Sequence, residues 1–187
     1  MEKDLLLVID MQNVYAKGGE WCCPGTEAAA EKIKQLIAQA NEKMDIVFTA
    51  FYAPQDPVGT WQDYNRDYAE INANDYNNEI MDILKAEAGH YPLYGKSTYS
   101  SLTIPELTEA VGKAKRVVIT GVVAECCVLA TAMAAIDAGA YVIYLTDAVA
   151  GFSKELEESV ERILSMLEPL QVKRMTTEEY LSEADPA

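Results

Sequence analysis

Two adjacent cysteines, Cys126 and Cys127, follow an apolar run in the segment GVVAECCV. A cysteine among valines and alanines is usually an inert small hydrophobic residue, whereas a thiol at the junction of a strand and a helix can be an activated nucleophile. Two other residues suit a thiol-based reaction: Asp10 ends the apolar run LLLVI, and Lys96 lies in the segment YGKSTYS. Taken singly, the aspartate is more typical of a turn and the lysine of a solvated surface.

Together, Asp10, Lys96 and a cysteine at a helix start have the right chemistry for a catalytic unit. The cation and the helix dipole would favour the thiolate form of the cysteine, and the carboxylate could accept its proton. We therefore expect acyl transfer to a thiolate, provided that the fold brings these three side chains to one place.

Strand-like and helix-like patterns alternate over the whole length of the chain. Strands are predicted at residues 5–9, 45–51, 93–96, 116–120, 141–145 and 171–174. Helices are predicted from Pro24-Gly25-Thr26 onward, within residues 100–114, and at residues 78–87, 125–138, 154–167 and 176–184. This alternation implies a parallel sheet covered on both faces, with right-handed crossovers. We predict a single-domain, three-layer αβα sandwich with a mostly parallel, doubly wound sheet.

In folds of this type the working groups gather at the carboxyl ends of the strands. Asp10, Lys96 and the Cys126-Cys127 pair each follow or end a predicted strand, so we expect them at one edge of the sheet. Thr103 is predicted to cap a helix that has Pro105 in its first turn.

Residues 54–78 are polar and aromatic and show no clear period. This segment is consistent with a plain surface loop, with a lid or pocket wall, or with a subunit interface. The sequence leaves these three alternatives open.

The composition predicts one domain over residues 1–187, because half of the residues are apolar and the chain is short for two cores. The formal charge of −15 would repel a phosphate backbone or an anionic membrane surface, so neither nucleic acid nor membrane is expected as a partner. The apolar stretch near the amino terminus is too short for a signal peptide or a membrane span. We expect a cytoplasmic protein.

The four cysteines form two adjacent pairs, Cys22-Cys23 and Cys126-Cys127, which a reducing compartment would keep as thiols. The C-x-x-C spacing of zinc sites is missing, and His90 is the single histidine of the sequence. We predict no metal and no cofactor, and we expect His90 to lie on the surface.

Three segments resemble the signature blocks of the isochorismatase-like cysteine hydrolases: IDMQNVY at 9–15, GKSTYSSL at 95–102, and GVVAECCVLATAMAAIDAGAYVIYLTDA at 121–148. That family includes nicotinamidases and N-carbamoylsarcosine amidohydrolase. The resemblance covers nearly the whole chain in the right order and spacing. In this family an aspartate, a lysine and a cysteine form the catalytic triad, and matching the blocks places these roles on Asp10, Lys96 and Cys127.

The same resemblance assigns further roles near the cysteine. It favours Cys127 over Cys126 as nucleophile, because the family's cysteine stands directly before a helical valine, here Val128. It implies a cis peptide bond between Val122 and Val123. It also implies an oxyanion hole made by the backbone amides of Val123 and Cys127.

One departure from the family narrows the reaction. Nicotinamidases resemble one another in carrying an Asp-x-His element, with further histidines, for a metal, whereas the matching segment here reads TAFYAPQDP. Isochorismatases share the fold without relying on a cysteine nucleophile. The resemblance therefore implies a metal-independent cysteine hydrolase that cleaves a C–N bond of a small amide, ureide or carbamoyl compound through a thioester.

The pocket and the assembly are predicted more coarsely. Tyr15, Phe51, Trp61 and Tyr99 are placed to bind a small substrate, although aromatic residues also dominate cores. Relatives commonly form homo-oligomers, and we expect the same here. The alternatives are a catalytically silent relative that binds a metabolite or a partner protein, and an isochorismatase-type hydrolase. A nucleotide-binding module is disfavoured because neither G-x-G-x-x-G nor a P-loop occurs.

Overall fold

A parallel sheet forms the centre of the protein in the computed structural model, which describes residues 3–40 and 42–184. Within these residues six strands form one sheet in the order β3-β2-β1-β4-β5-β6, and every neighbouring pair is parallel. The strands are β1 (Asp4–Ile9), β2 (Met44–Phe51), β3 (Leu93–Lys96), β4 (Val117–Val122), β5 (Val142–Ala150) and β6 (Val172–Met175). The ends of the predicted domain, residues 1–2 and 185–187, lie outside the described residues.

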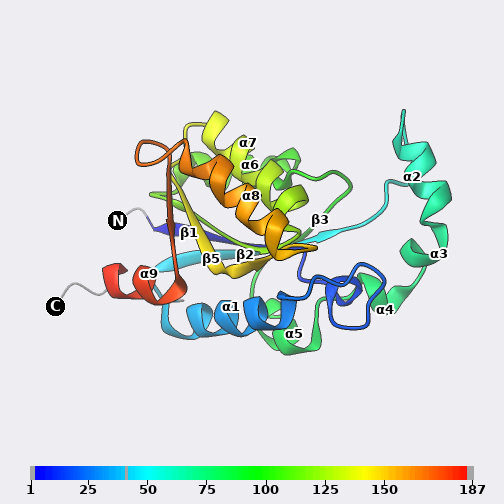
Figure 1. The fold of residues 1–187 in the computed structure, drawn as a ribbon, viewed down its shortest axis with the longest axis horizontal. Helices are drawn as coiled ribbons and strands as arrows, with labels where there is room; N and C mark the ends of the chain where they lie inside the picture. Colours follow the sequence, from blue (N-terminus) through cyan, green and yellow to red (C-terminus); the bar gives the residue numbers. More distant parts are fainter. Residues whose placement is uncertain (1–2, 41, 185–187) are drawn as a thin grey trace.

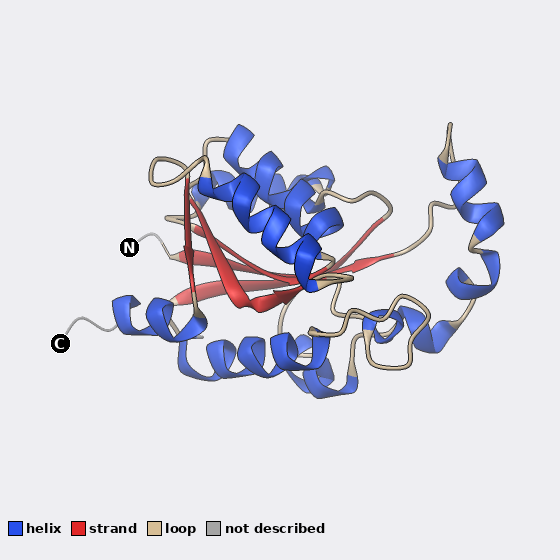
Figure 2. Ribbon diagram, in the orientation of Figure 1, coloured by secondary structure: helices blue, strands red, loops and turns tan. Residues whose placement is uncertain are grey.

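Helices cover both faces of this sheet, as Figures 1 and 2 show. One face carries α1 (Thr26–Ala40), α5 (Asp82–Ala88) and α9 (Thr177–Ala184). The other carries α6 (Pro105–Lys113), α7 (Leu129–Asp137) and α8 (Lys154–Ser165). The predicted αβα arrangement with a parallel sheet is confirmed.

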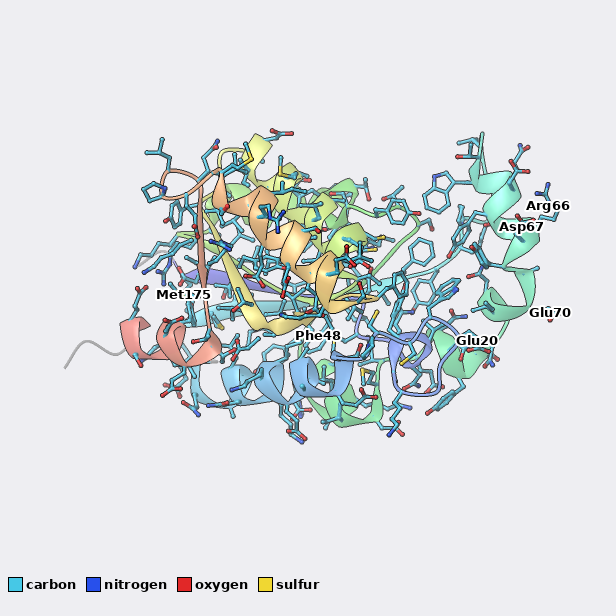
Figure 3. The ribbon with its side chains drawn as sticks, viewed as in Figure 1. Glu20, Phe48, Arg66, Asp67, Glu70 and Met175 are labelled. Carbon is cyan, nitrogen blue, oxygen red and sulfur yellow. The ribbon has the colours of Figure 1, made fainter. Side chains whose placement is uncertain are left out.

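The two hydrophobic cores lie on opposite faces of the central strands. All six residues of β1 are buried, and so are all six of β4. Leu6 and Val8 of β1 belong to the core on the α1 side, whereas Leu5 and Leu7 belong to the core on the α7 side. This division follows from the two-residue period of a strand, and the continuous apolar runs follow from covering both faces. Phe48 of β2 lies between the sheet and α1 (Figure 3).

The start of α6 differs from its prediction. Pro105 occupies the first turn as expected, but Thr103 does not cap the helix. The Thr103 hydroxyl instead donates to the carbonyl of Ser100 at 2.9 Å, inside a 3-10 turn over Ser101–Thr103 that precedes the helix. The helix α6 therefore begins after Ile104, without a side-chain cap.

Residues 61–78 form an arm that extends beyond the end of β2 (Figure 1). The arm consists of three short helices, α2 (Trp61–Asp67), α3 (Ala69–Asn72) and α4 (Asp75–Asn78), where the sequence showed no clear period. Neither α2 nor α3 contains a buried residue. The predicted helix at 78–87 begins later, because α5 starts at Asp82.

Two polar side chains that follow β1 attach the base of the arm. The amide of Asn13 donates to the carbonyl of Tyr76 at 2.9 Å, and the amide of Gln12 donates to the carbonyl of Asn78 at 2.9 Å. The arm is thus fastened next to the carboxyl end of β1. Across the described part of the chain, none of the helices has the length and apolar character needed to span a bilayer.

Candidate active site

Asp10, Lys96 and Cys127 meet at the carboxyl ends of the strands. The ammonium of Lys96 donates to Oδ2 of Asp10 at 2.6 Å and to Sγ of Cys127 at 3.3 Å. All three residues are buried. The structure therefore brings together the anionic, cationic and sulfur-bearing groups that the sequence separates by up to 117 positions, from residue 10 to residue 127.

Asp10 follows β1 directly and has a left-handed backbone conformation, with φ of 51°. Aspartate is one of the few residue types other than glycine that visit this region readily. Its backbone N–H donates to the carbonyl of Thr49 at 3.0 Å, and its Oδ1 accepts the Thr49 hydroxyl at 2.8 Å. Both carboxylate oxygens therefore have a partner, which offsets the desolvation of a buried charge.

Lys96 is the last residue of β3 and uses every donor of its ammonium group. Its third hydrogen bond goes to the carbonyl of Thr98 at 3.0 Å, in addition to those to Asp10 and Cys127. An ammonium group has three N–H donors, so this buried cation is fully satisfied. Its Nζ also lies 5.5 Å from the centroid of the Phe51 ring.

Cys127 lies in a π-helical turn, Ala124–Val128, between β4 and α7. This turn replaces the first residues of the predicted helix 125–138. The carbonyl of Val123 accepts the backbone N–H of Cys126 at 3.0 Å and that of Val128 at 3.2 Å, which fixes the turn. The peptide bond between Val122 and Val123 is cis, at the position that the family resemblance implies.

The pKa of the Cys127 thiol is raised above its ordinary value. Burial is the main cause, followed by the negative charge of Asp10, and the Lys96 ammonium opposes both. The Lys96 ammonium favours the thiolate, as expected, but the net shift of the pKa is upward. Burial and the aspartate outweigh the lysine, and the thiol stays protonated at neutral pH.

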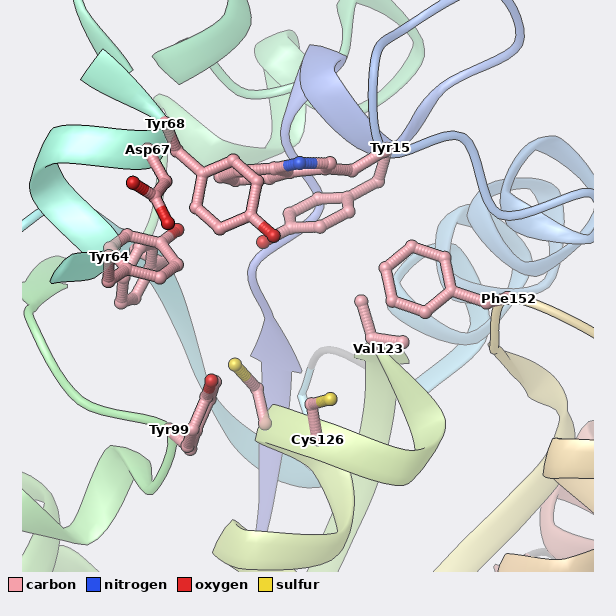
Figure 4. Close-up of a pocket in the computed structure, with 11 residues that line it drawn as sticks. Tyr15, Tyr64, Asp67, Tyr68, Tyr99, Val123, Cys126 and Phe152 are labelled. Atoms are coloured by element: carbon pink, nitrogen blue, oxygen red, sulfur yellow. The ribbon is translucent and has the colours of Figure 1, made fainter. Parts of the chain in front are cut away.

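A cavity of about 460 Å³ opens beside the cysteine (Figure 4). Its lining consists of Tyr15, Trp21, Phe51, Tyr64, Asp67, Tyr68, Tyr99, Val123, Cys126, Cys127 and Phe152. Three of the four predicted pocket aromatics, Tyr15, Phe51 and Tyr99, are in this lining. Trp61 is not, because its ring packs behind the wall, 6.1 Å from the Phe51 centroid and 5.4 Å from that of Tyr99.

Thr49, Gln12 and five of the residues that line the cavity were not predicted from the sequence. Thr49 had one signal, a hydroxyl residue inside the otherwise apolar strand DIVFTAF. Gln12 holds the end of β2, where its amide donates to the Phe51 carbonyl at 3.0 Å and its Oε1 accepts the Phe51 N–H at 2.7 Å. Trp21, Tyr64, Asp67, Tyr68 and Phe152 come from loops and from the arm, whose placement no periodicity reveals.

Metal-ligating side chains are scattered in this structure. Within residues 3–40 and 42–184, no three histidine, cysteine, aspartate or glutamate side chains are grouped so that they could hold a metal ion. His90 is exposed, as expected, in the turn after α5.

Residues 4–179 match the family model described as the isochorismatase domain. None of the curated proteins matches the chain. Among solved structures, an isochorismatase family protein from Desulfovibrio vulgaris is 18% identical, with a TM-score of 0.82 and coverage of 98% of this chain and 99% of that chain. N-carbamoylsarcosine amidase from Thermoplasma acidophilum is 21% identical, with a TM-score of 0.71 and coverage of 94% and 96%.

The pyrazinamidase of Pyrococcus horikoshii, solved in complex with zinc, is 24% identical, with a TM-score of 0.72 and coverage of 93% of this chain and 99% of that chain. At these identities the solved structures establish a common fold. The family match spans most of the chain and includes the segments that supply Asp10, Lys96 and Cys127. The chain therefore belongs to the isochorismatase family.

Proposed function

We propose that this protein hydrolyses a C–N bond of a small amide, ureide or carbamoyl compound, with Cys127 as nucleophile and without a metal. The observation that carries the proposal is the contact of Lys96 with both Asp10 and Cys127 beside a cavity. Two solved relatives that share the fold are named as amidases, N-carbamoylsarcosine amidase and pyrazinamidase. We propose a reaction without a metal because, within residues 3–40 and 42–184, no three metal-ligating side chains are grouped.

In the first half of the reaction, Asp10 accepts the proton of the Cys127 thiol, and the sulfur forms a bond to the substrate carbonyl carbon. The negative charge that develops on the carbonyl oxygen is stabilised by the backbone N–H groups of Val123 and Cys127. Asp10 then gives its proton to the leaving nitrogen, and the C–N bond breaks. Ammonia or an amine departs, and the acyl group remains on Cys127 as a thioester.

In the second half, Asp10 accepts a proton from water while the water oxygen bonds to the thioester carbon. The C–S bond breaks, and the proton returns to the Cys127 sulfur. The net reaction adds one water to one amide and yields one acid and one amine. Lys96 holds the carboxylate of Asp10 and stabilises the thiolate that forms 3.3 Å away.

The raised pKa of Cys127 fits this order of events. A thiol that is protonated at rest becomes nucleophilic only when its proton has an acceptor, and Asp10 is the carboxylate in the contact. When a substrate occupies the cavity, the backbone N–H groups of Val123 and Cys127 can bind its carbonyl oxygen while the proton is transferred. As the sulfur bonds to the carbonyl carbon, its negative charge moves to the carbonyl oxygen, which these N–H groups stabilise.

The test is ammonia release across a panel of small amides and ureides. We expect at least one compound to be hydrolysed by the wild-type protein and not by Cys127→Ala. Asp10→Asn should reduce the rate by on the order of a hundredfold or more, because the general base is lost. Cys22→Ala is the matched control, since Cys22 is half-buried and lies outside the cavity lining. Equal rates for wild-type and Cys127→Ala protein on every compound would refute the proposal and favour a catalytically silent binding protein.

A further inference from the structure

We propose that the cavity takes amides whose end remote from the reacting carbonyl carries a cation, such as a quaternary or methylated ammonium group. This inference rests on the proposed function, because it names the substrate class of the same site. Its basis is the chemistry of the lining, in which seven of the eleven side chains are aromatic and the one charged side chain is a carboxylate.

The aromatic rings form a wall in which Trp21 contacts three tyrosine rings. The ring centroid of Trp21 lies 5.5 Å from that of Tyr68, 6.2 Å from that of Tyr64 and 6.0 Å from that of Tyr15. The interplanar angles are 87°, 48° and 35° respectively, so the rings are tilted toward one another rather than stacked flat. Figure 4 shows Tyr15 and Tyr68 together at the top of the space, Tyr64 below Asp67 at the left, Tyr99 at the lower left and Phe152 at the right.

Such a wall is suited to a desolvated cation. The face of an aromatic ring carries partial negative charge, and a cation within about 6 Å of the centroid gains roughly 0.5–2 kcal/mol per favourable ring. Burial raises the pKa of Tyr15 and of Tyr64, so both phenols stay neutral at physiological pH. They therefore line the cavity without adding a formal charge.

The carboxylate of Asp67 favours a cationic ligand over an anionic one. Arg66 pairs with Asp67 at 2.9 Å and with Asp63 at 2.6 Å, so the three side chains together keep one negative charge. Figure 3 shows Arg66 and Asp67 on the arm, with Glu70 in the following helix. Arg66 does not line the cavity, whereas Asp67 does. A substrate carboxylate would meet Asp67 without a cationic side chain among the lining residues.

The buried lysine does not change this balance. Lys96 uses all three of its donors on Asp10, Thr98 and Cys127, and the charge of Asp10 offsets its own. The formal charge of −15 also raises the local concentration of cations around the protein. Both the local and the overall charge therefore favour a positively charged ligand over a negatively charged one.

A neutral aromatic amide is the strongest competing ligand, since it would stack on the same rings. Three amides of equal length separate the possibilities: 4-(trimethylammonio)butanamide is cationic, 5,5-dimethylhexanamide is its neutral isostere, and glutaramate is anionic. Three methylenes separate the end group from the carbonyl in each, which keeps the reactivity of the carbonyl similar. The trimethylammonium group donates no hydrogen bond, so a preference for it reports charge and ring contact alone.

Binding is measured on the Cys127→Ala protein, in which turnover cannot intervene. Trp21 lines the cavity and Trp61 packs behind its wall, and these are the two tryptophans of the sequence, so intrinsic fluorescence reports on the site. At about 150 mM salt, where long-range charge effects are screened, we expect the cationic amide to bind at least tenfold more tightly than the neutral isostere. Equal or tighter binding of the neutral amide, or no measurable binding of the cationic amide, overturns the proposal.

Matched variants locate the effect. Asp67→Asn should weaken binding of the cationic amide by roughly three- to tenfold and leave that of the neutral isostere unchanged. Tyr68→Leu should weaken it as well, and Tyr68→Phe should not, because the ring is retained. Glu70→Gln is the control, since Glu70 is an exposed carboxylate outside the lining. Equal losses for Asp67→Asn and Glu70→Gln would overturn the proposal.

Ammonia release by the wild-type protein separates this inference from the proposed function. If kcat/KM is as high for the neutral amide as for the cationic one, the cation preference fails while the cysteine hydrolase stands. If the Cys127→Ala protein prefers the cationic amide and the wild-type protein hydrolyses none of the small amides and ureides tested, the proposed function fails while the charge preference stands as a property of the cavity.

Discussion

The ammonium of Lys96 lies 2.6 Å from the carboxylate of Asp10, and neither side chain is exposed to solvent. Removing one partner of a buried pair leaves the other charge without compensation. Lys96→Met should therefore lower the free energy of unfolding by about 3–5 kcal/mol. Denaturation by urea gives the value.

Two further variants complete this experiment. The double variant Asp10→Asn with Lys96→Met should be more stable than Lys96→Met alone, because no uncompensated charge is buried in it. Lys113→Met, which removes the partner of Glu109 on the exposed side of α6, should change stability little. A double variant less stable than Lys96→Met would show that the Asp10 carboxylate is stabilised without the lysine.

Asp10→Asn should separate the reactivity of the thiol from catalysis. The negative charge of Asp10 raises the pKa of Cys127, so its removal lowers that pKa and increases the thiolate fraction at any given pH. The midpoint of the alkylation rate of Cys127 by iodoacetamide against pH should move to lower pH, while amide hydrolysis falls. Lys96→Met should move the midpoint to higher pH, because the lysine lowers the pKa. Mass spectrometry of the Cys127 peptide measures both, and a rise in the Asp10→Asn midpoint would contradict the assigned electrostatics.

Thr49 is predicted to act as a positioning residue for Asp10. Thr49→Val removes the hydroxyl that donates to Oδ1 at 2.8 Å, so the carboxylate is held less firmly toward Cys127. We expect kcat to fall by on the order of tenfold with KM nearly unchanged. Thr120→Val is the matched control, since that buried hydroxyl donates to the carbonyl of Leu7 in the adjacent strand. We expect both variants to lose about 1 kcal/mol of stability, and only Thr49→Val to lose kcat, if Thr49 positions Asp10. A normal kcat in Thr49→Val would exclude this positioning role.

Among the segments near the carboxyl ends of the strands, the arm should be the least protected against amide hydrogen exchange. The helices α2 and α3 contain no buried residues, whereas every residue of β1 and β4 is buried. Backbone amides of residues 61–72 should exchange with deuterium orders of magnitude faster than those of β1. Hydrogen exchange with mass spectrometry at two protein concentrations checks this. Protection of residues 61–72 that disappears on dilution would instead indicate cover by a second copy of the chain.

The fold and the meeting of Asp10, Lys96 and Cys127 were accessible from the sequence for specific physical reasons. The strands β1 and β4 are buried on both faces, so their runs are continuously apolar, and the residues after them stand out. Asp10, Lys96 and Cys127 follow or end such strands, and parallel topology brings those positions to one edge. The rule that sites form at the carboxyl ends of parallel strands and the family's signature segments point to the same three residues.

Other features depend on information that local sequence does not contain. The helices α2 and α3 contain no fully buried residue, so they show no clear amphipathic period. The positions of Tyr64, Asp67 and Tyr68 on the cavity wall were therefore unpredictable. The direction of the Cys127 pKa shift depends on how deeply the thiol is buried, which only packing determines. Thr103 was a reasonable cap by type, but the 3-10 turn that follows Ser100 engages its hydroxyl first.

The order of the strands also fixes how long the lysine must be. β2 lies between β3, which supplies Lys96, and β1, which leads to Asp10, so the two side chains together bridge two inter-strand spacings, about 10 Å of sheet width. Lysine is among the longest side chains, and here it passes close to the ring of Phe51 on the strand between. An ornithine at this position, one methylene shorter, would weaken the contact between the amine and the carboxylate. A homologue with an additional strand inserted between β3 and β1 would need to recruit its cation from a different element altogether.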